Sequence, residues 1–116
     1  VMMKIAFTAQ GQTWEAAMDP RFGRTAYLLV FDEADETLTV HDNTAVADEA
    51  HGAGPRTAAL LLQTGAEVLV TGNGPGGNAG RALAGRVKVF AGAGQGTVQE
   101  ALERYRSGDL AECSLA

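Results

Sequence analysis

The sequence of 116 residues predicts an α/β domain in which helices pack on one mixed, five-stranded sheet. Three observations lead to this prediction. Short β-prone runs recur along the chain, helical patterns separate the later runs, and glycine-rich turns follow several of them. The expected order is strand, strand, strand, helix, strand, helix, strand, helix. At this length we expect a single domain over residues 1–116, with a core at about residues 3–110 and a short C-terminal tail.

The first half of the chain is expected to supply three strands. Lys4–Thr8 starts the sheet as a central strand, and a long connection follows over residues 9–25. The second strand, Ala26–Asp32, is apolar on both faces. An acidic turn, Glu33–Glu36, leads into Thr37–Asp42, where apolar and polar residues alternate. The second and third strands should therefore form a hairpin.

The second half alternates helices with strands. A helix is expected from Pro55, which suits a first turn, to Gly65, which suits a C-terminal stop. The strand Glu67–Thr71 is followed by a glycine loop and a weak helix over residues 78–84. The last strand, Val87–Phe90, runs into a second glycine loop.

The final helix has the clearest signal. Thr97-Val98-Gln99-Glu100 has the spacing of a capping box, and apolar residues then repeat at helical intervals up to Gly108. Residues 109–116 are expected to be a tail.

Chain direction places the unusual loops together. If the second strand is antiparallel to the first and pairs with the third in a hairpin, the third runs parallel to the first. Helical crossovers make the fourth and fifth strands parallel as well. The loops after strands one, three, four and five then leave the sheet at one end, where open α/β sheets bind ligands.

Charge and composition exclude several classes of protein. The formal net charge of −5 argues against a nucleic-acid binder. No stretch approaches transmembrane length, so we expect no membrane contact and a cytoplasmic protein. The single cysteine, Cys113, cannot form an intrachain disulfide or a cluster site with several thiolates from one chain.

The most informative motif is the loop Gly72-Asn73-Gly74-Pro75-Gly76-Gly77, which follows a buried strand. Glycines at such a position let an anion approach unpaired backbone N–H groups, although a tight turn alone would explain them too. The loop also fits G-x-G-x-x-G, but Phe90-Ala91 ends the next strand where a dinucleotide site needs an acid. No Walker lysine follows either.

Three further residues are candidate ligand contacts. Arg21 and Arg24 could bind an anion, or could simply pair with Asp19 and the acidic hairpin. His51 could ligate a metal or donate to an anion, or could be a surface residue near a helix start. The carboxylates and nucleophiles that hydrolytic or phosphoryl chemistry needs are missing from the strand ends. We therefore expect a protein that is not an enzyme.

Five segments, taken together, resemble the dinitrogenase iron–molybdenum cofactor biosynthesis family. They are Lys4-Ile5-Ala6, Pro20-Arg21-Phe22-Gly23-Arg24, His51-Gly52-Ala53-Gly54, Thr71-Gly72-Asn73-Gly74-Pro75 and Gly92-Ala93-Gly94-Gln95-Gly96-Thr97-Val98. The match covers about Met3 to Leu110 in the expected order. Two runs, Phe7-Thr8-Ala9-Gln10-Gly11 and Thr13-Trp14-Glu15, resemble the small stand-alone members, some of which hold a molybdenum–copper sulfide cluster without a thiolate cage.

The resemblance implies an RNase H-like, three-layer α/β/α fold and non-enzymatic binding of a metal–sulfur cluster. The cofactor would be a molybdenum–copper sulfide or, alternatively, an iron–molybdenum cofactor precursor. A cluster donor or acceptor protein is the implied partner, and the chain would be a monomer or weak dimer. The implied contacts are Arg21, Arg24, His51 (also a metal ligand), Gly52, Gly72, Asn73, Gly74, Gly92 and Gly94.

Two other functions remain open from the residues alone. The same cradle would suit a small-molecule or nucleotide-phosphate sensor that acts through a partner protein. A degenerate enzyme of the RNase H-like type would need a carboxylate set that the sequence does not provide.

Overall fold

One six-stranded sheet forms the centre of the structure, a computed structural model that describes residues 2–115. Its strands are β1 Lys4–Ala9, β2 Tyr27–Asp32, β3 Thr37–Asp42, β4 Val68–Val70, β5 Lys88–Ala91 and β6 Ala111–Glu112, in the order β3-β2-β1-β4-β5-β6. β1, β4 and β5 are parallel, and β2 pairs antiparallel with both β1 and β3. The predicted hairpin and strand directions are confirmed.

The sixth strand corrects the prediction of five strands and a C-terminal tail. β6 lies within the expected tail and runs antiparallel to β5, with Glu112 opposite Phe90. The Cys113 N–H then donates to the Val89 carbonyl at 2.7 Å. The two residues of β6 are exposed and too few to show a periodic pattern in the sequence. The strand forms only because it pairs with the otherwise unpaired edge of β5.

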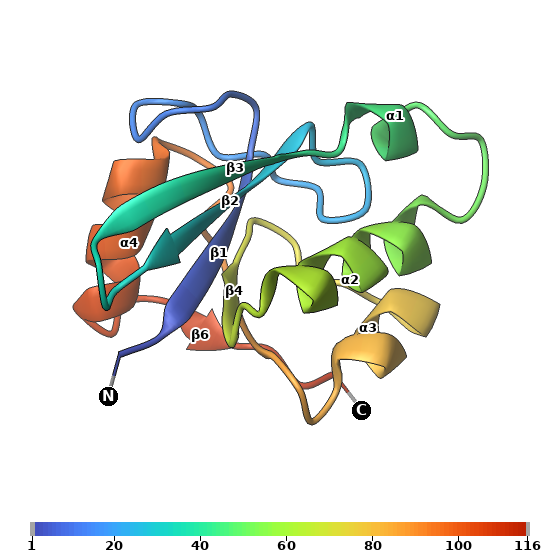
Figure 1. Cartoon of the computed structure of the whole chain (residues 1–116). Helices are drawn as coiled ribbons and strands as arrows, with labels where there is room; N and C mark the ends of the chain where they lie inside the picture. Colours follow the sequence, from blue (N-terminus) through green and yellow to red (C-terminus); the bar gives the residue numbers. More distant parts are fainter. Residues whose placement is uncertain (1, 116) are drawn as a thin grey trace.

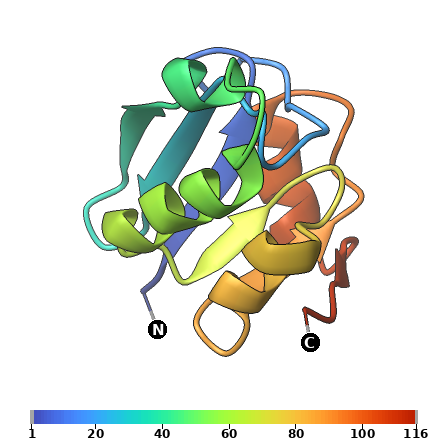
Figure 2. The same ribbon diagram turned by 90° about the vertical axis from the view of Figure 1, so that its right-hand side faces the viewer.

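Helices cover both faces of the sheet (Figures 1 and 2). α2 Ala53–Thr64 and α3 Gly77–Leu83 lie on one face, and α4 Val98–Arg106 lies on the other. A short helix, α1 Thr44–Ala47, was not expected; it precedes α2. None of the helices within residues 2–115 has the length and apolar character needed to cross a membrane.

The central strands bury side chains on both faces. Ile5 and Phe7 join the cluster under α4, whereas Ala6 joins the cluster under α2 and α3. In β4, Val68 joins the cluster under α4, and Leu69 joins the cluster under α2 and α3. The alternation explains why these strands read as continuous apolar runs.

The long connection after β1 is ordered by contacts with α4. The carbonyls of Trp14 and Ala16 accept hydrogen bonds from the N–H groups of Gln99 and Val98, at 3.0 and 2.9 Å. The Trp14 ring packs edge-on against Phe7 and Phe31. The part of the connection that contains Trp14 and Ala16 therefore covers the sheet, and the part that follows it contributes to the candidate site described below.

The start of α4 provides a first test. Thr97 and Glu100 form the predicted capping box, since each side chain accepts a hydrogen bond from the other's backbone N–H, at 3.2 and 2.8 Å. Thr97→Ala should lower the free energy of unfolding by about 1 kcal/mol. Urea denaturation measures this free energy, and Gln99→Ala, at an exposed position in the same turn, is the control. Equal losses in both variants would contradict the role of the cap.

Candidate functional site

Four loops leave the sheet at the carboxyl ends of β1, β3, β4 and β5, as the sequence predicted. They span residues 10–26, 43–52, 71–76 and 92–97. Direct backbone bonds join three of them. The Asn73 N–H donates to the Pro20 carbonyl at 2.8 Å, and the Gly92 N–H donates to the Gly72 carbonyl at 2.9 Å.

Two glycines let these three loops meet without side chains between them. A Cβ atom on Gly72 would lie 2.6 Å from Pro20 Cα and 2.8 Å from Gly94 Cα. A Cβ atom on Gly94 would lie 3.3 Å from Gly72 Cα. Backbone atoms cannot yield as a flexible side chain can, so only glycine fits at position 72.

A hollow of about 440 Å³ opens over this contact. Its lining residues are Pro20, Gly72, Asn73, Gly92, Gly94, Gln95 and Arg104. Among the residues described, no carboxylate lines the hollow, and the backbone N–H groups of Gly94 and Gln95 have no protein acceptor. The side chains of Asn73, Gln95 and Arg104 add further donors. The hollow thus offers a surplus of hydrogen-bond donors, which suits an anion.

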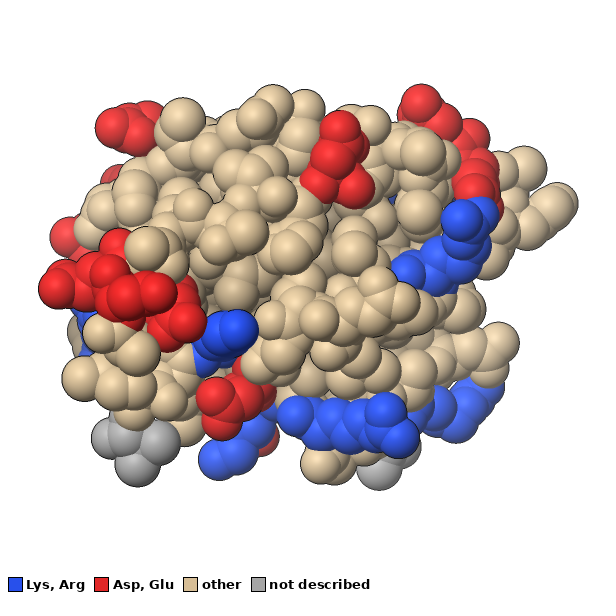
Figure 3. All heavy atoms as spheres, in the orientation of Figure 1, with Lys and Arg blue, Asp and Glu red and all other residues tan. Residues whose placement is uncertain are grey.

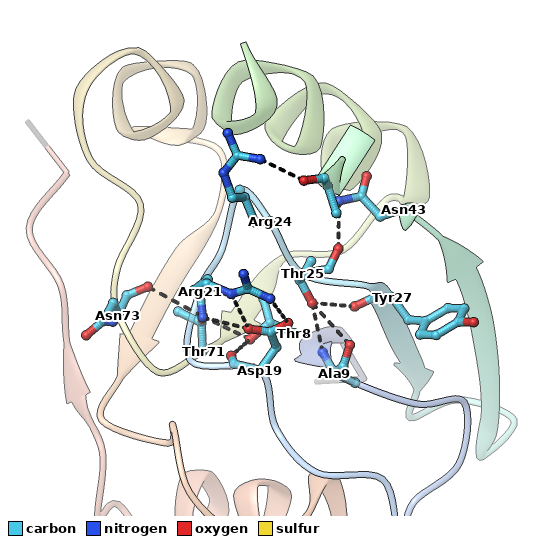
Figure 4. A network of polar contacts seen from close by, with 12 residues as sticks. Thr8, Ala9, Asp19, Arg21, Arg24, Thr25, Tyr27, Asn43, Thr71 and Asn73 are labelled. Atoms are coloured by element: carbon cyan, nitrogen blue, oxygen red, sulfur yellow. Dashed lines mark hydrogen bonds and ion pairs between the residues drawn. The ribbon is translucent and has the colours of Figure 1, made fainter. Parts of the chain in front are cut away.

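Buried hydroxyl groups connect the loops beneath the hollow (Figure 4). Thr8 Oγ1 lies 2.7 Å from the Asp19 carbonyl oxygen, to which it donates, and 2.9 Å from Thr71 Oγ1. Thr8, Asp19 and Thr71 are all buried. This network holds the Pro20 loop against the end of β4.

Arg21 pairs with Asp19, one of the two outcomes that the sequence left open. Both the backbone N–H and Nε of Arg21 donate to Asp19 Oδ1, at 3.0 and 3.2 Å. The hydrogen bond and the attraction of the carboxylate raise the pKa of Arg21 above its usual value. The Arg21 side chain is still 60% exposed, so most of the guanidinium faces solvent.

Arg24 does not pair with the acidic hairpin. Its Nη1 donates to the Ala47 carbonyl at 2.7 Å, at the end of α1, and Nη2 is 3.5 Å from the Ala50 carbonyl. In Figure 4 the side chain extends toward the helices, away from Arg21. Arg24 therefore links its own loop to the segment that carries His51.

The structure separates the predicted site residues into two groups. Gly72, Asn73, Gly92 and Gly94 line the hollow. His51, Gly52 and Gly74 do not line it, and neither does Arg21 or Arg24. His51 is exposed in the connection between α1 and α2, and Gly52 begins α2 with a φ of 78°. Gly74 packs instead against Cys113.

Sequence reasoning missed three lining residues, Pro20, Gln95 and Arg104. Pro20 and Gln95 lie inside motifs that were already singled out. Arg104 lies in the last turn of α4, whose residues read only as a helix. No local signal could have found it, because its place in the hollow follows from how α4 packs.

Two further features of the structure help to define what the site offers. Within residues 2–115, no three His, Cys, Asp or Glu side chains converge in a way that could hold a metal ion. A second hollow of about 570 Å³ lies near the amino end of β5, but acidic and basic residues both line it, including Glu67, Arg86, Lys88 and Glu112. It lacks the uniform donor character of the first.

The fold and the first hollow define a small α/β domain with a donor-lined cradle at the carboxyl ends of its strands. Residues 3–108 match the family described as dinitrogenase iron-molybdenum cofactor, and the chain belongs to this family. The resemblance of the five sequence segments is thereby confirmed.

Solved structures support the same relationship. The apo form of the orange protein from Desulfovibrio gigas is 37% identical, with a TM-score of 0.90 over 98% of this chain and 95% of that chain. A Thermotoga protein with a provisional NifB assignment is 33% identical, with a TM-score of 0.82 over 96% of this chain and 93% of that one. The similarity to the orange protein confirms the predicted resemblance to the small members of the family.

More distant structures share the fold alone. A Methanocaldococcus jannaschii protein is 14% identical, with a TM-score of 0.72 over 98% of this chain and 97% of that one. The comparison supports the mixed α/β architecture, while the finer RNase H-like assignment stays a prediction. No curated protein gave a significant match.

Proposed function

We propose that this protein binds and carries a metal–sulfur cluster without catalysing a reaction. A molybdenum–copper sulfide is the favoured cargo, with an iron–molybdenum cofactor precursor as the alternative. The observation that carries the proposal is the hollow at Gly72, Gly92 and Gly94, which presents donors and no carboxylate among the residues described. Membership of the cofactor family and the similarity to the orange protein support the same class of ligand.

The chemistry of the hollow fits a cluster held without covalent bonds. A metal–sulfide cluster is an anion with acceptor sulfur atoms on its outside. Backbone N–H groups and amide side chains can donate to these atoms, and an arginine can offset the charge. Because the described residues offer no triad of protein ligands, sulfide would supply most of the metal ligands, and His51 would add one protein ligand at most.

The proposed contacts fall into an inner and an outer set. Gly72, Asn73, Gly92 and Gly94 form the inner set, at the hollow. The outer set is Arg21, Arg24, His51, Gly52 and Gly74. Arg21 follows the lining residue Pro20, and Arg24 holds the segment with His51, the proposed metal ligand.

The biological setting remains part of the proposal. A carrier needs a protein that donates the cluster or accepts it, and an open hollow lets the cluster pass between them. We propose that the chain acts in the cytoplasm as a monomer or weak dimer.

The direct test is an anaerobic titration with tetrathiomolybdate, with and without Cu(I), followed by visible spectroscopy and metal analysis after desalting. Stoichiometric uptake with new charge-transfer bands is the expected result. Molybdate and inorganic phosphate serve as controls for simple anion binding. Protein that ignores both thiomolybdate and copper but binds a nucleotide phosphate would overturn the proposal in favour of a sensor module.

Arg21→Ala and Arg24→Ala test the outer set. Each should weaken tetrathiomolybdate binding by about tenfold, the effect of losing one charge-assisted hydrogen bond. Each protein should still fold, because the Arg21 side chain is largely exposed and Arg24 only half-buried. Circular dichroism checks the fold. Wild-type affinity in both variants would remove these arginines from the site.

A further inference from the structure

The hollow contains one residue with a full positive charge. Of its seven lining residues, only Arg104 is ionised, and the others contribute backbone or amide groups. The protein as a whole is acidic, with a formal net charge of −5. On the face in Figure 3, Lys and Arg gather along the lower edge, below α2 and α3, and in a second group on the right, near α1. Among the described residues that line the hollow, Arg104 therefore carries the one charge that could attract an anion.

Arg104 is held in place with donors to spare. Its Nη1 donates to the Gly92 carbonyl at 3.2 Å, and its Nε donates to Asp109 Oδ2 at 3.3 Å. A guanidinium has five N–H donors, so three remain after these two bonds. Within residues 2–115 no acceptor is bonded to those three. These two bonds hold the guanidinium of Arg104 at the hollow and leave its other N–H groups able to donate to a ligand.

The two partners of Arg104 are themselves fixed. Gly92 has a φ of 96°, a conformation that side-chain-bearing residues rarely adopt, and its N–H is bonded to Gly72. The Asp109 N–H donates to the carbonyl of Arg104 itself at 3.0 Å, which closes the end of α4. Asp109 is 68% exposed, so water screens its carboxylate and it neutralises Arg104 only weakly.

We propose that Arg104 is the specificity-determining residue of the hollow: it selects ligands that carry net negative charge and bonds their outward acceptor atoms. This inference rests on the proposed function and extends it to a residue outside the family motifs. It names the ligand class as an anionic cluster rather than a neutral molecule. The planar fork of arginine also offers two parallel bonds, which a lysine cannot match.

A purely structural role for Arg104 is the rival explanation. A cation in the last turn of a helix stabilises that helix through its dipole, and Arg104 also bonds the Asp109 side chain. Such a role predicts a loss of stability without a specific loss of anion binding. Arg106 provides a matched comparison, because it lies in the same turn but pairs with Glu33 at 3.3 Å and packs over Phe31.

The experiment measures tetrathiomolybdate affinity at several salt concentrations for wild type, Arg104→Ala, Arg104→Lys, Arg104→Glu and Arg106→Ala. Arg104→Ala should bind at least about tenfold more weakly. Its affinity should also depend less on salt, since one screened attraction is gone. Arg104→Lys should recover part of the loss, Arg104→Glu should lose binding altogether, and Arg106→Ala should stay within about twofold of wild type.

The outcomes separate this inference from the function on which it rests. If wild type binds and Arg104→Ala binds equally well with the same salt dependence, the assignment of Arg104 is overturned and the cluster-binding function stands. An equal loss in Arg106→Ala would also overturn it, by pointing to helix stability. If wild type itself takes up no thiomolybdate, the proposed function fails, and this inference fails with it.

Discussion

Gly72→Ala is expected to lower the free energy of unfolding by about 2–4 kcal/mol and to abolish ligand binding in the hollow. The added Cβ atom would meet Pro20 Cα at 2.6 Å and Gly94 Cα at 2.8 Å. The Pro20 carbonyl is bonded to the Asn73 N–H, and the two residues before Gly94 are also held, because the N–H groups of Gly92 and Ala93 donate to Gly72 and Thr71. The three loops would have to separate, and the hollow that they form would change shape.

Gly76→Ala is the matched control in the same loop. Gly76 has a φ of −118°, which any residue adopts, and nothing lies within 4 Å of a Cβ atom there. We expect little net change in stability, because the lower entropy of the unfolded chain adds up to about 1 kcal/mol, whereas alanine is a poorer N-cap than glycine for α3. Urea denaturation and thiomolybdate titration of both variants decide the matter. Similar behaviour of the two would mean that the close contact at Gly72 does not hold the site together.

The sequence predicted the fold well where local patterns agreed with packing. The strand directions follow from the hairpin and the helical crossovers, which fix them irrespective of side-chain detail. The capping box and the C-terminal stop at Gly65 were also correct, because both depend on a few neighbouring residues. β6 was not predicted, because its two residues form a strand only by pairing with the edge of β5.

The sequence predicted which backbone loops meet at the candidate site, but it did not predict where the charged side chains lie. Glycine motifs identified the residues that meet at the hollow, because close approach of backbones demands glycine. The side chains of Arg21 and Arg24 could not be placed in this way. Their partners, the buried Asp19 and the carbonyl at the end of α1, depend on how each loop turns. Arg104 enters the hollow only because α4 packs against the sheet next to β5.

Phe22→Ala is expected to produce the largest loss of stability outside the sheet, about 3–5 kcal/mol. The Phe22 side chain is 4% exposed and packs in the cluster under α2 and α3, with Leu28 and Leu61 among its members. It lies in the loop between Pro20 and Arg24 and anchors that loop to the core. Truncation would leave a cavity and free the loop, so the loop should open more easily than the rest of the domain.

Hydrogen exchange separates this local effect from a general loss of stability. In the native protein the Arg21 N–H donates to Asp19 Oδ1 and the Thr25 N–H donates to the Phe22 carbonyl. In Phe22→Ala these two amides should exchange through an opening that costs less free energy than global unfolding. In Leu28→Ala, which truncates a fully buried residue of β2, they should follow global stability. If both amides in Phe22→Ala also follow global unfolding, Phe22 is a core residue only, and the loop at the hollow is held by its hydrogen bonds alone.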